Sequence, residues 1–120
     1  MTARAVASVA LLFLSFGVAG TASASSSAAH ARKAEVVKVA AKEFSFTLSR
    51  HSIAAGRVAF DIRNNGKMRH DFEIDGHTSK IVGPGQTTTL TVTLKRGSYP
   101  YKCTVDSHAK LGMKGVLRVT

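Results

Sequence analysis

The chain has 120 residues, 44% of them hydrophobic, with a single cysteine and a formal net charge of +10 at pH 7. This length suits one small domain, and one cysteine excludes an internal disulfide. The strongly basic balance favours an anionic partner, such as an acidic redox protein, anionic lipid or anionic wall polymer.

The N-terminus has the pattern of an export signal. Arg4 gives a positive start, and residues 6–19 form a mostly apolar stretch. This stretch is too short to span a bilayer comfortably, which takes about 20 apolar residues. Ala22-Ser23-Ala24 then fits a cleavage site. We therefore predict that residues 1–24 are a signal peptide and that the protein is exported, to a periplasm or outside the cell.

The boundaries after the signal follow from composition. The small, polar residues 25–34 predict a flexible tail, and residues 35–120 predict one domain without a transmembrane segment. Export argues against nucleic acid as the partner. A second cleavage site at Ala29-His30-Ala31 and an uncleaved membrane anchor remain open alternatives.

From Glu35 onward the chain predicts short β-strands with a period of two. Turn signals such as Asn64-Asn65-Gly66 and Gly83-Pro84-Gly85 separate them. The alternating stretches fall at residues 37–39, 44–48, 58–62, 70–74, 87–94, 99–103 and 117–119. Seven to eight such strands with no helical period predict an all-β protein, an antiparallel β-sandwich.

The parity of two strands places metal-binding side chains together. His70 shares a face with Phe72 and Ile74, so it should point inward near the start of its strand. Cys103 continues the parity of Tyr101 at the end of another strand. Both groups should therefore lie at one pole of the sandwich.

The loop after that strand reads C-x4-H-x4-M, formed by Cys103, His108 and Met113, with His70 arriving from 33 residues upstream. A thiolate, two imidazoles and a weak axial thioether suit copper that cycles between Cu(I) and Cu(II). Zinc could use three of these donors, but a thioether is a poor zinc ligand. The pattern therefore predicts a copper site.

The loop, together with the upstream stretch "IAAGRVAFDIRNNGKMRHDFEI", resembles the ligand regions of the cupredoxins, the small blue-copper proteins. The similarity covers roughly residues 35–120. It implies an antiparallel Greek-key β-sandwich of the cupredoxin-like type that binds one copper ion through His70, Cys103, His108 and Met113.

The resemblance also implies roles for neighbours of the ligands. In the family an Asn commonly follows the first histidine and ties the two ligand loops together, whereas here that residue is Asp71. Asp71 is expected to accept a hydrogen bond from Thr104, and its charge should favour Cu(II). The family pattern further implies that His108 reaches the surface through an apolar patch, here formed by Ala109, Leu111 and Met68.

The resulting hypothesis is an exported blue-copper protein that carries single electrons between redox partners, acts as a monomer and is not an enzyme. A protein for copper delivery or storage would use the same ligands and remains an alternative. A third hypothesis is a thiol enzyme using Cys103, His108 and Asp106, which leaves Met113 and His70 unexplained.

Overall fold

The computed structural model describes residues 17, 20 and 33–120. The predicted signal peptide, residues 1–24, lies outside the described residues apart from Gly17 and Gly20. Most of the predicted tail, residues 25–34, lies outside them as well. No helix within the described residues is long and apolar enough to cross a membrane.

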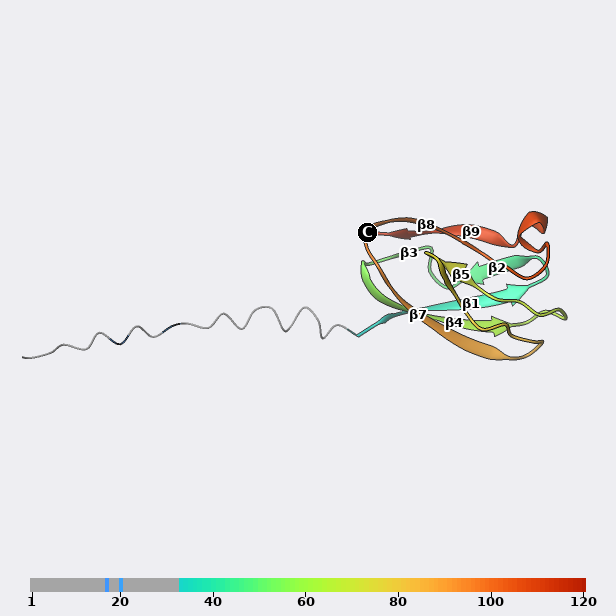
Figure 1. Ribbon diagram of the computed structural model, residues 1–120, viewed down its shortest axis with the longest axis horizontal. Helices are drawn as coiled ribbons and strands as arrows, with labels where there is room; N and C mark the ends of the chain where they lie inside the picture. Colours follow the sequence, from blue (N-terminus) through green and yellow to red (C-terminus); the bar gives the residue numbers. More distant parts are fainter. Residues whose placement is uncertain (1–16, 18–19, 21–32) are drawn as a thin grey trace, which may run out of the picture.

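Two β-sheets pack face to face to form the domain (Figure 1). The first sheet has the order β2-β1-β4-β7 and the second the order β3-β9-β8-β5-β6. The strands are β1 (Glu35–Lys42), β2 (Ser45–Leu48), β3 (Ser52–Ile53), β4 (Gly56–Asn64), β5 (Glu73–Ile74), β6 (His77–Thr78), β7 (Thr87–Leu94), β8 (Gly97–Lys102) and β9 (Lys114–Val119).

The alternation in the sequence corresponds to the two faces of each sheet. Along β4, Val58, Phe60 and Ile62 are buried while the residues between them are partly or fully exposed. Along β7, Val92 and Leu94 are buried opposite an exposed row of threonines. The predicted all-β sandwich is confirmed, because every described strand except the exposed β6 contributes apolar side chains to a common core.

The pairing of the strands differs in two places from a purely antiparallel sandwich. Strand β1 runs parallel to β4, and β3 runs parallel to β9. The described residues contain nine strands, against the seven to eight expected, because β3, β5 and β6 are only two residues long. Side-chain parity identifies the buried face of a strand but not the direction of its neighbour, so parity alone could not reveal the parallel pairs.

The connections at one end of the sandwich bring distant segments together (Figure 1). The β1–β2 turn, the segment after β4 and the loop between β8 and β9 all lie at this end, on the right of the view, opposite the C-terminus. The last of these loops contains η2 (Ala109–Leu111), a single 3-10 turn. It ends at Gly112, whose φ of 107° requires glycine-like freedom.

Strand β9 offers a matched test of the core. Leu117 is fully buried, whereas the adjacent Val116 is 56% exposed. We expect Leu117→Ala to lower the free energy of unfolding by about 2–5 kcal/mol, because it leaves a cavity between the sheets. Val116→Ala should change it by less than about 0.5 kcal/mol. Urea unfolding of the metal-free protein measures both values, and equal losses would contradict the assignment of the faces.

Candidate metal centre

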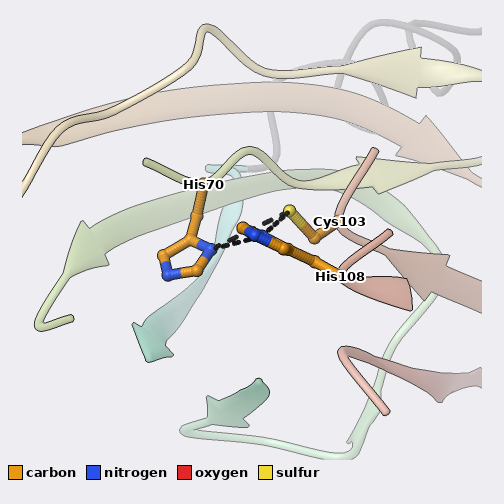
Figure 2. A group of neighbouring side chains, drawn as sticks. All are labelled: His70, Cys103 and His108. Carbon is orange, nitrogen blue, oxygen red and sulfur yellow. Dashed lines mark hydrogen bonds between the residues drawn. The ribbon is translucent and has the colours of Figure 1, made fainter. Parts of the chain in front are cut away.

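Three metal-capable side chains converge at this end of the sandwich (Figure 2). His70, Cys103 and His108 are all buried, and one donor atom from each lies within 4.8 Å of the others. The two Nδ1 atoms are 3.2 Å apart. The Cys103 Sγ lies 3.7 Å from Nδ1 of His108 and 4.0 Å from Nδ1 of His70.

The first histidine is held by its backbone. The N–H of His70 donates to the carbonyl of Val82, and the N–H of Val82 donates back to His70, at 3.0 and 2.8 Å. The amide of Asn64, at the end of β4, donates to the same Val82 carbonyl at 2.8 Å and to the carbonyl of Met68 at 2.7 Å. These bonds join the segment that carries His70 to the end of β4.

The other donors lie on the β8–β9 loop, which closes on itself. The N–H of Cys103 donates to the carbonyl of Met113 at 3.0 Å, and the N–H of Met113 donates to the carbonyl of His108 at 3.1 Å. Met113 is fully buried. The backbone thus ties Met113 to both Cys103 and His108, and its role as a ligand stays a prediction.

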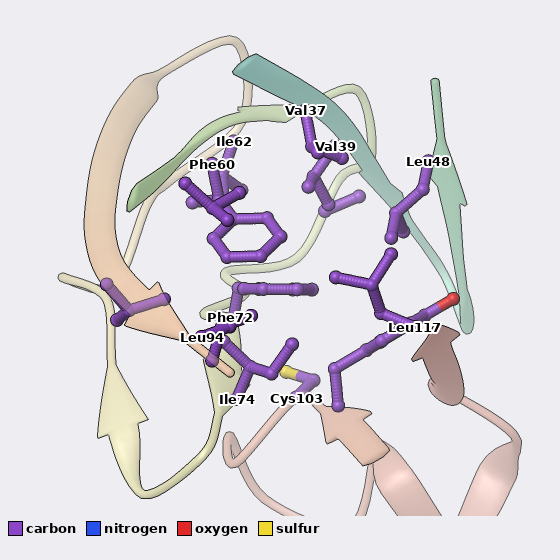
Figure 3. Packing of buried hydrophobic residues seen from close by; sticks show 14 of the residues in the cluster. Val37, Val39, Leu48, Phe60, Ile62, Phe72, Ile74, Leu94, Cys103 and Leu117 are labelled. Carbon is purple, nitrogen blue, oxygen red and sulfur yellow. The ribbon is translucent and has the colours of Figure 1, made fainter. Parts of the chain in front are cut away.

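The sulfur of Cys103 borders the hydrophobic core. Figure 3 shows it at one end of the buried cluster that includes Phe72, Ile74 and Leu117. Burial raises the pKa of the Cys103 thiol above its ordinary value; the backbone N–H groups of Asp71 and Val105 oppose this shift, and the carboxylate of Asp71 adds to it. The thiol therefore keeps its proton in the metal-free protein, and a bound metal would have to displace it.

Asp71 links the two loops. Its Oδ1 accepts a hydrogen bond from the N–H of Thr104 at 2.6 Å, and its Oδ2 accepts one from the Thr104 hydroxyl. Asp71 follows His70 and Thr104 follows Cys103, so one carboxylate fixes the spacing of two donor residues. Asp71 itself is buried, so these charge-assisted hydrogen bonds are shielded from water.

Glu43 is a site residue that the sequence analysis missed. It lies in the β1–β2 turn, and its Oε1 is 3.0 Å from Nε2 of His70. The same oxygen accepts the N–H groups of Lys67 at 2.8 Å and Met68 at 2.7 Å. No sequence pattern connects this lone carboxylate with a histidine 27 positions later.

These contacts determine which nitrogen of the neutral His70 ring carries the hydrogen. The Met68 N–H is the main cause that lowers the pKa of Glu43 from 4.5 to about 2; partial burial opposes it, and His70 and Lys67 assist it. An ionised carboxylate can only accept hydrogen bonds, so Nε2 of His70 must donate. In neutral His70 this leaves the lone pair on Nδ1, the atom that faces Cys103 and His108.

His108 does not reach the surface as the resemblance implied. It is only 2% exposed. Its ring packs edge-on against Phe44, with ring centroids 5.1 Å apart. Its Nε2 is the one buried side-chain nitrogen or oxygen without a hydrogen-bond partner in the part of the chain that the structure describes. Bulky Phe44, from a strand connection far away in sequence, explains the difference.

The three donors fit a trigonal metal ion. Bonds of about 2.0 Å to nitrogen and 2.3 Å to sulfur, at trigonal angles, would separate the donors by roughly 3.5–3.8 Å. The observed separations of 3.2, 3.7 and 4.0 Å lie around these values. Two nitrogens and a sulfur from buried side chains, with one nitrogen lone pair already aimed inward, therefore match the geometry and the chemistry of such a site.

A family model described as a cupredoxin-like domain matches residues 8–119. The chain belongs to this cupredoxin-like family. Comparison with curated protein sequences gives no match.

Solved structures with the same fold include three auracyanins. A Na-dithionite reduced auracyanin from the photosynthetic bacterium Roseiflexus castenholzii is 19% identical with a TM-score of 0.61, and the match covers 73% of this chain and 99% of that one. Auracyanin A from Chloroflexus aurantiacus, described as a "blue" copper protein, is 21% identical with a TM-score of 0.62, covering 73% and 100%. Auracyanin B is 22% identical with a TM-score of 0.60, covering 74% and 91%.

The link between Asp71 and Thr104 in this cupredoxin-like domain can be tested without metal. Asp71→Ala removes both acceptors, and we expect it to lower the free energy of unfolding by about 1.5–3 kcal/mol, the range for hydrogen bonds to charged groups. Asp71→Asn should cost less, because its oxygen can accept the Thr104 N–H while its NH₂ donates to the hydroxyl. Urea unfolding of the metal-free variants compares them. If the Asn variant is as unstable as the Ala variant, the two bonds do not provide this stabilisation.

Proposed function

We propose that this protein is an exported type 1 copper protein that carries single electrons between redox partners. In this proposal His70, Cys103 and His108 bind one copper ion, and Met113 serves as a weak fourth ligand. The observation that carries it is the convergence of two Nδ1 atoms and one Sγ at separations suited to trigonal coordination. Family membership and the similarity of the fold to auracyanin A, described as a "blue" copper protein, support it.

The bound copper would supply a one-electron couple between Cu(I) and Cu(II). The protein's own residues would keep the donors nearly still during electron transfer. The Asp71–Thr104 bonds fix the two loops, and the backbone bonds of Met113 fix the β8–β9 loop. Burial of the donors excludes water. A site that is already organised moves few atoms when its charge changes, so electron transfer should be fast.

The donor set favours a carrier over the alternatives. Four ligands would leave no open position for a substrate, which a catalytic metal site keeps; we therefore infer that the protein is not an enzyme. Copper delivery by ligand exchange needs donor atoms that an acceptor can reach. All three clustered donors are buried, which favours electron transfer over delivery or storage.

The surface near the site suggests the kind of partner. The loops that carry the donors expose the basic residues Lys67, Arg69 and Lys110. They also expose Met68 and Leu111, at 42% and 59%. This combination suits a redox protein with an acidic rim around an apolar centre. We propose that a monomer makes this contact after residues 1–24 have been removed, with residues 35–120 as the copper-binding domain.

Copper addition tests the proposed site. We expect Cu(II) to give the intense blue colour and the narrow EPR splitting of a thiolate–Cu(II) site, with reversible reduction. Cys103→Ser should abolish the colour, because the serine hydroxyl is no substitute for a thiolate. Ser107→Ala, an exposed change in the same loop, is the matched control and should keep it. A wild-type protein that stays colourless, or a blue Cys103→Ser variant, would refute the assignment.

Asp71→Asn tests the electrostatic part of the proposal. The variant removes one negative charge beside Cys103 while keeping the size of the side chain. Since a negative charge favours Cu(II) over Cu(I), the reduction potential should rise. Cyclic voltammetry of the copper-loaded wild type and variant measures the change. A potential that stays the same or falls would show that Asp71 does not tune the metal in this way.

A further inference from the structure

The β1–β2 turn contacts both imidazoles of the site, although it contributes no donor. Glu43 Oε1 lies 3.0 Å from Nε2 of His70. The next residue, Phe44, packs against the ring of His108 at a centroid distance of 5.1 Å and an interplanar angle of 62°. Two consecutive residues therefore each touch a different histidine, and these histidines are 38 positions apart in the chain.

The turn itself is firmly held. Lys42 pairs with Ser45 in the antiparallel register of β1 and β2, which fixes the two ends of the turn. The Glu43 carboxylate is held by the N–H groups of Lys67 and Met68. The side that faces the imidazoles is thus anchored to the sheet and to the loop before His70.

Gly66 leaves the space that the carboxylate occupies. A Cβ atom at this position would lie 2.3 Å from Glu43 Oε1, far inside contact distance. Gly66 is in the turn that the sequence marked as Asn64-Asn65-Gly66. The close approach of a carboxylate gives this glycine a role beyond turn formation, and it offers a way to displace Glu43 without changing its charge.

We propose that the Glu43–Phe44 turn is a positioning element that fixes both histidine rings for metal binding before the metal arrives. Glu43 selects the tautomer of His70 with hydrogen on Nε2 and leaves Nδ1 free. Phe44 restrains the ring of His108 and covers it from solvent. The positions of the two rings are observed in the structure, while the effect of the turn on copper binding rests on the proposed function.

Glu43 makes a hydrogen bond and Phe44 an aromatic contact, so removing each residue should have a different effect. Without Glu43, Nε2 of His70 loses its acceptor, and hydrogen can move to Nδ1, where it blocks the donor position. Without Phe44, the tautomer of His70 has no reason to change. His108 would instead gain motion and access to water, because its ring would lose the aromatic contact.

NMR of the metal-free protein tests the tautomer directly. The ¹⁵N shifts of the His70 ring distinguish protonated from unprotonated nitrogen. We expect wild type, Phe44→Leu and the exposed control Lys42→Gln to show hydrogen on Nε2 alone. Glu43→Ala and Gly66→Ala should show a mixture of tautomers. Glu43→Gln should restore the wild-type pattern in large part, because its amide oxygen can still accept.

Copper affinity gives the second measurement, by competition with a chelator. We expect Glu43→Ala and Gly66→Ala to bind Cu(I) about 10–100-fold more weakly than wild type, the usual effect of losing the partner of a ligand histidine. Lys42→Gln should stay within about twofold. For Phe44→Leu we expect faster solvent exchange at the His108 ring, with the His70 tautomer unchanged.

The outcomes separate this proposal from the function on which part of it rests. An unchanged His70 tautomer in both Glu43→Ala and Gly66→Ala would overturn the role of Glu43. Unchanged exchange at the His108 ring in Phe44→Leu would overturn the role of Phe44. Wild type that forms no blue copper site, together with variants that lose the His70 tautomer, would refute the proposed function and support the positioning role.

Discussion

The site depends on two loops that must meet at a fixed separation, because neither carries enough donors to hold a metal alone. One loop brings His70 and the other brings Cys103 and His108. The carboxylate of Asp71 joins them through both hydrogen-bonding groups of Thr104. The rest of the domain supports this junction: the sheets place both loops at one end, and the core fixes the strands from which the loops emerge.

Within each loop, hydrogen bonds also hold the donor residues in place. The pairing of His70 with Val82 and the bonds of Met113 to Cys103 and His108 are made by backbone groups. Side-chain contacts then adjust the orientation of the histidine rings and the spacing of the two loops. Glu43 orients one ring, Phe44 contacts the other, and Asp71 sets the spacing. The donor geometry thus comes from several weak constraints that act on different atoms.

Much of this arrangement could be predicted from sequence because it depends on period and spacing. Alternation placed Phe72 and Ile74 inside, and with them His70. The parity of Tyr101 did the same for Cys103. Strand direction could not be obtained this way, since parallel and antiparallel neighbours bury the same faces.

Contacts between residues that are distant in the sequence also could not be predicted from the sequence. Nothing in the sequence distinguishes Glu43 from other turn carboxylates, and its contact with His70 is visible only in the folded structure. The buried ring of His108 packs against Phe44, a residue 64 positions earlier in the sequence. The resemblance implied an exposed histidine, and only the packing of that turn shows otherwise. At 19–22% identity the solved structures establish the fold, so the chemistry has to be argued from these contacts.

The direction of β1 has a geometric consequence. The strand begins at Glu35, at the end of the sandwich where the C-terminus also lies, and runs to Lys42 beside the metal-binding pole (Figure 1). Eight residues of extended chain separate the two ends by about 25 Å. If the protein is immobilised through its N-terminal segment, for example on an electrode or a bead, the end that carries the metal-binding side chains faces outward into the solution. Attachment at that terminus therefore leaves the loops around His70, Cys103 and His108 accessible from the solution.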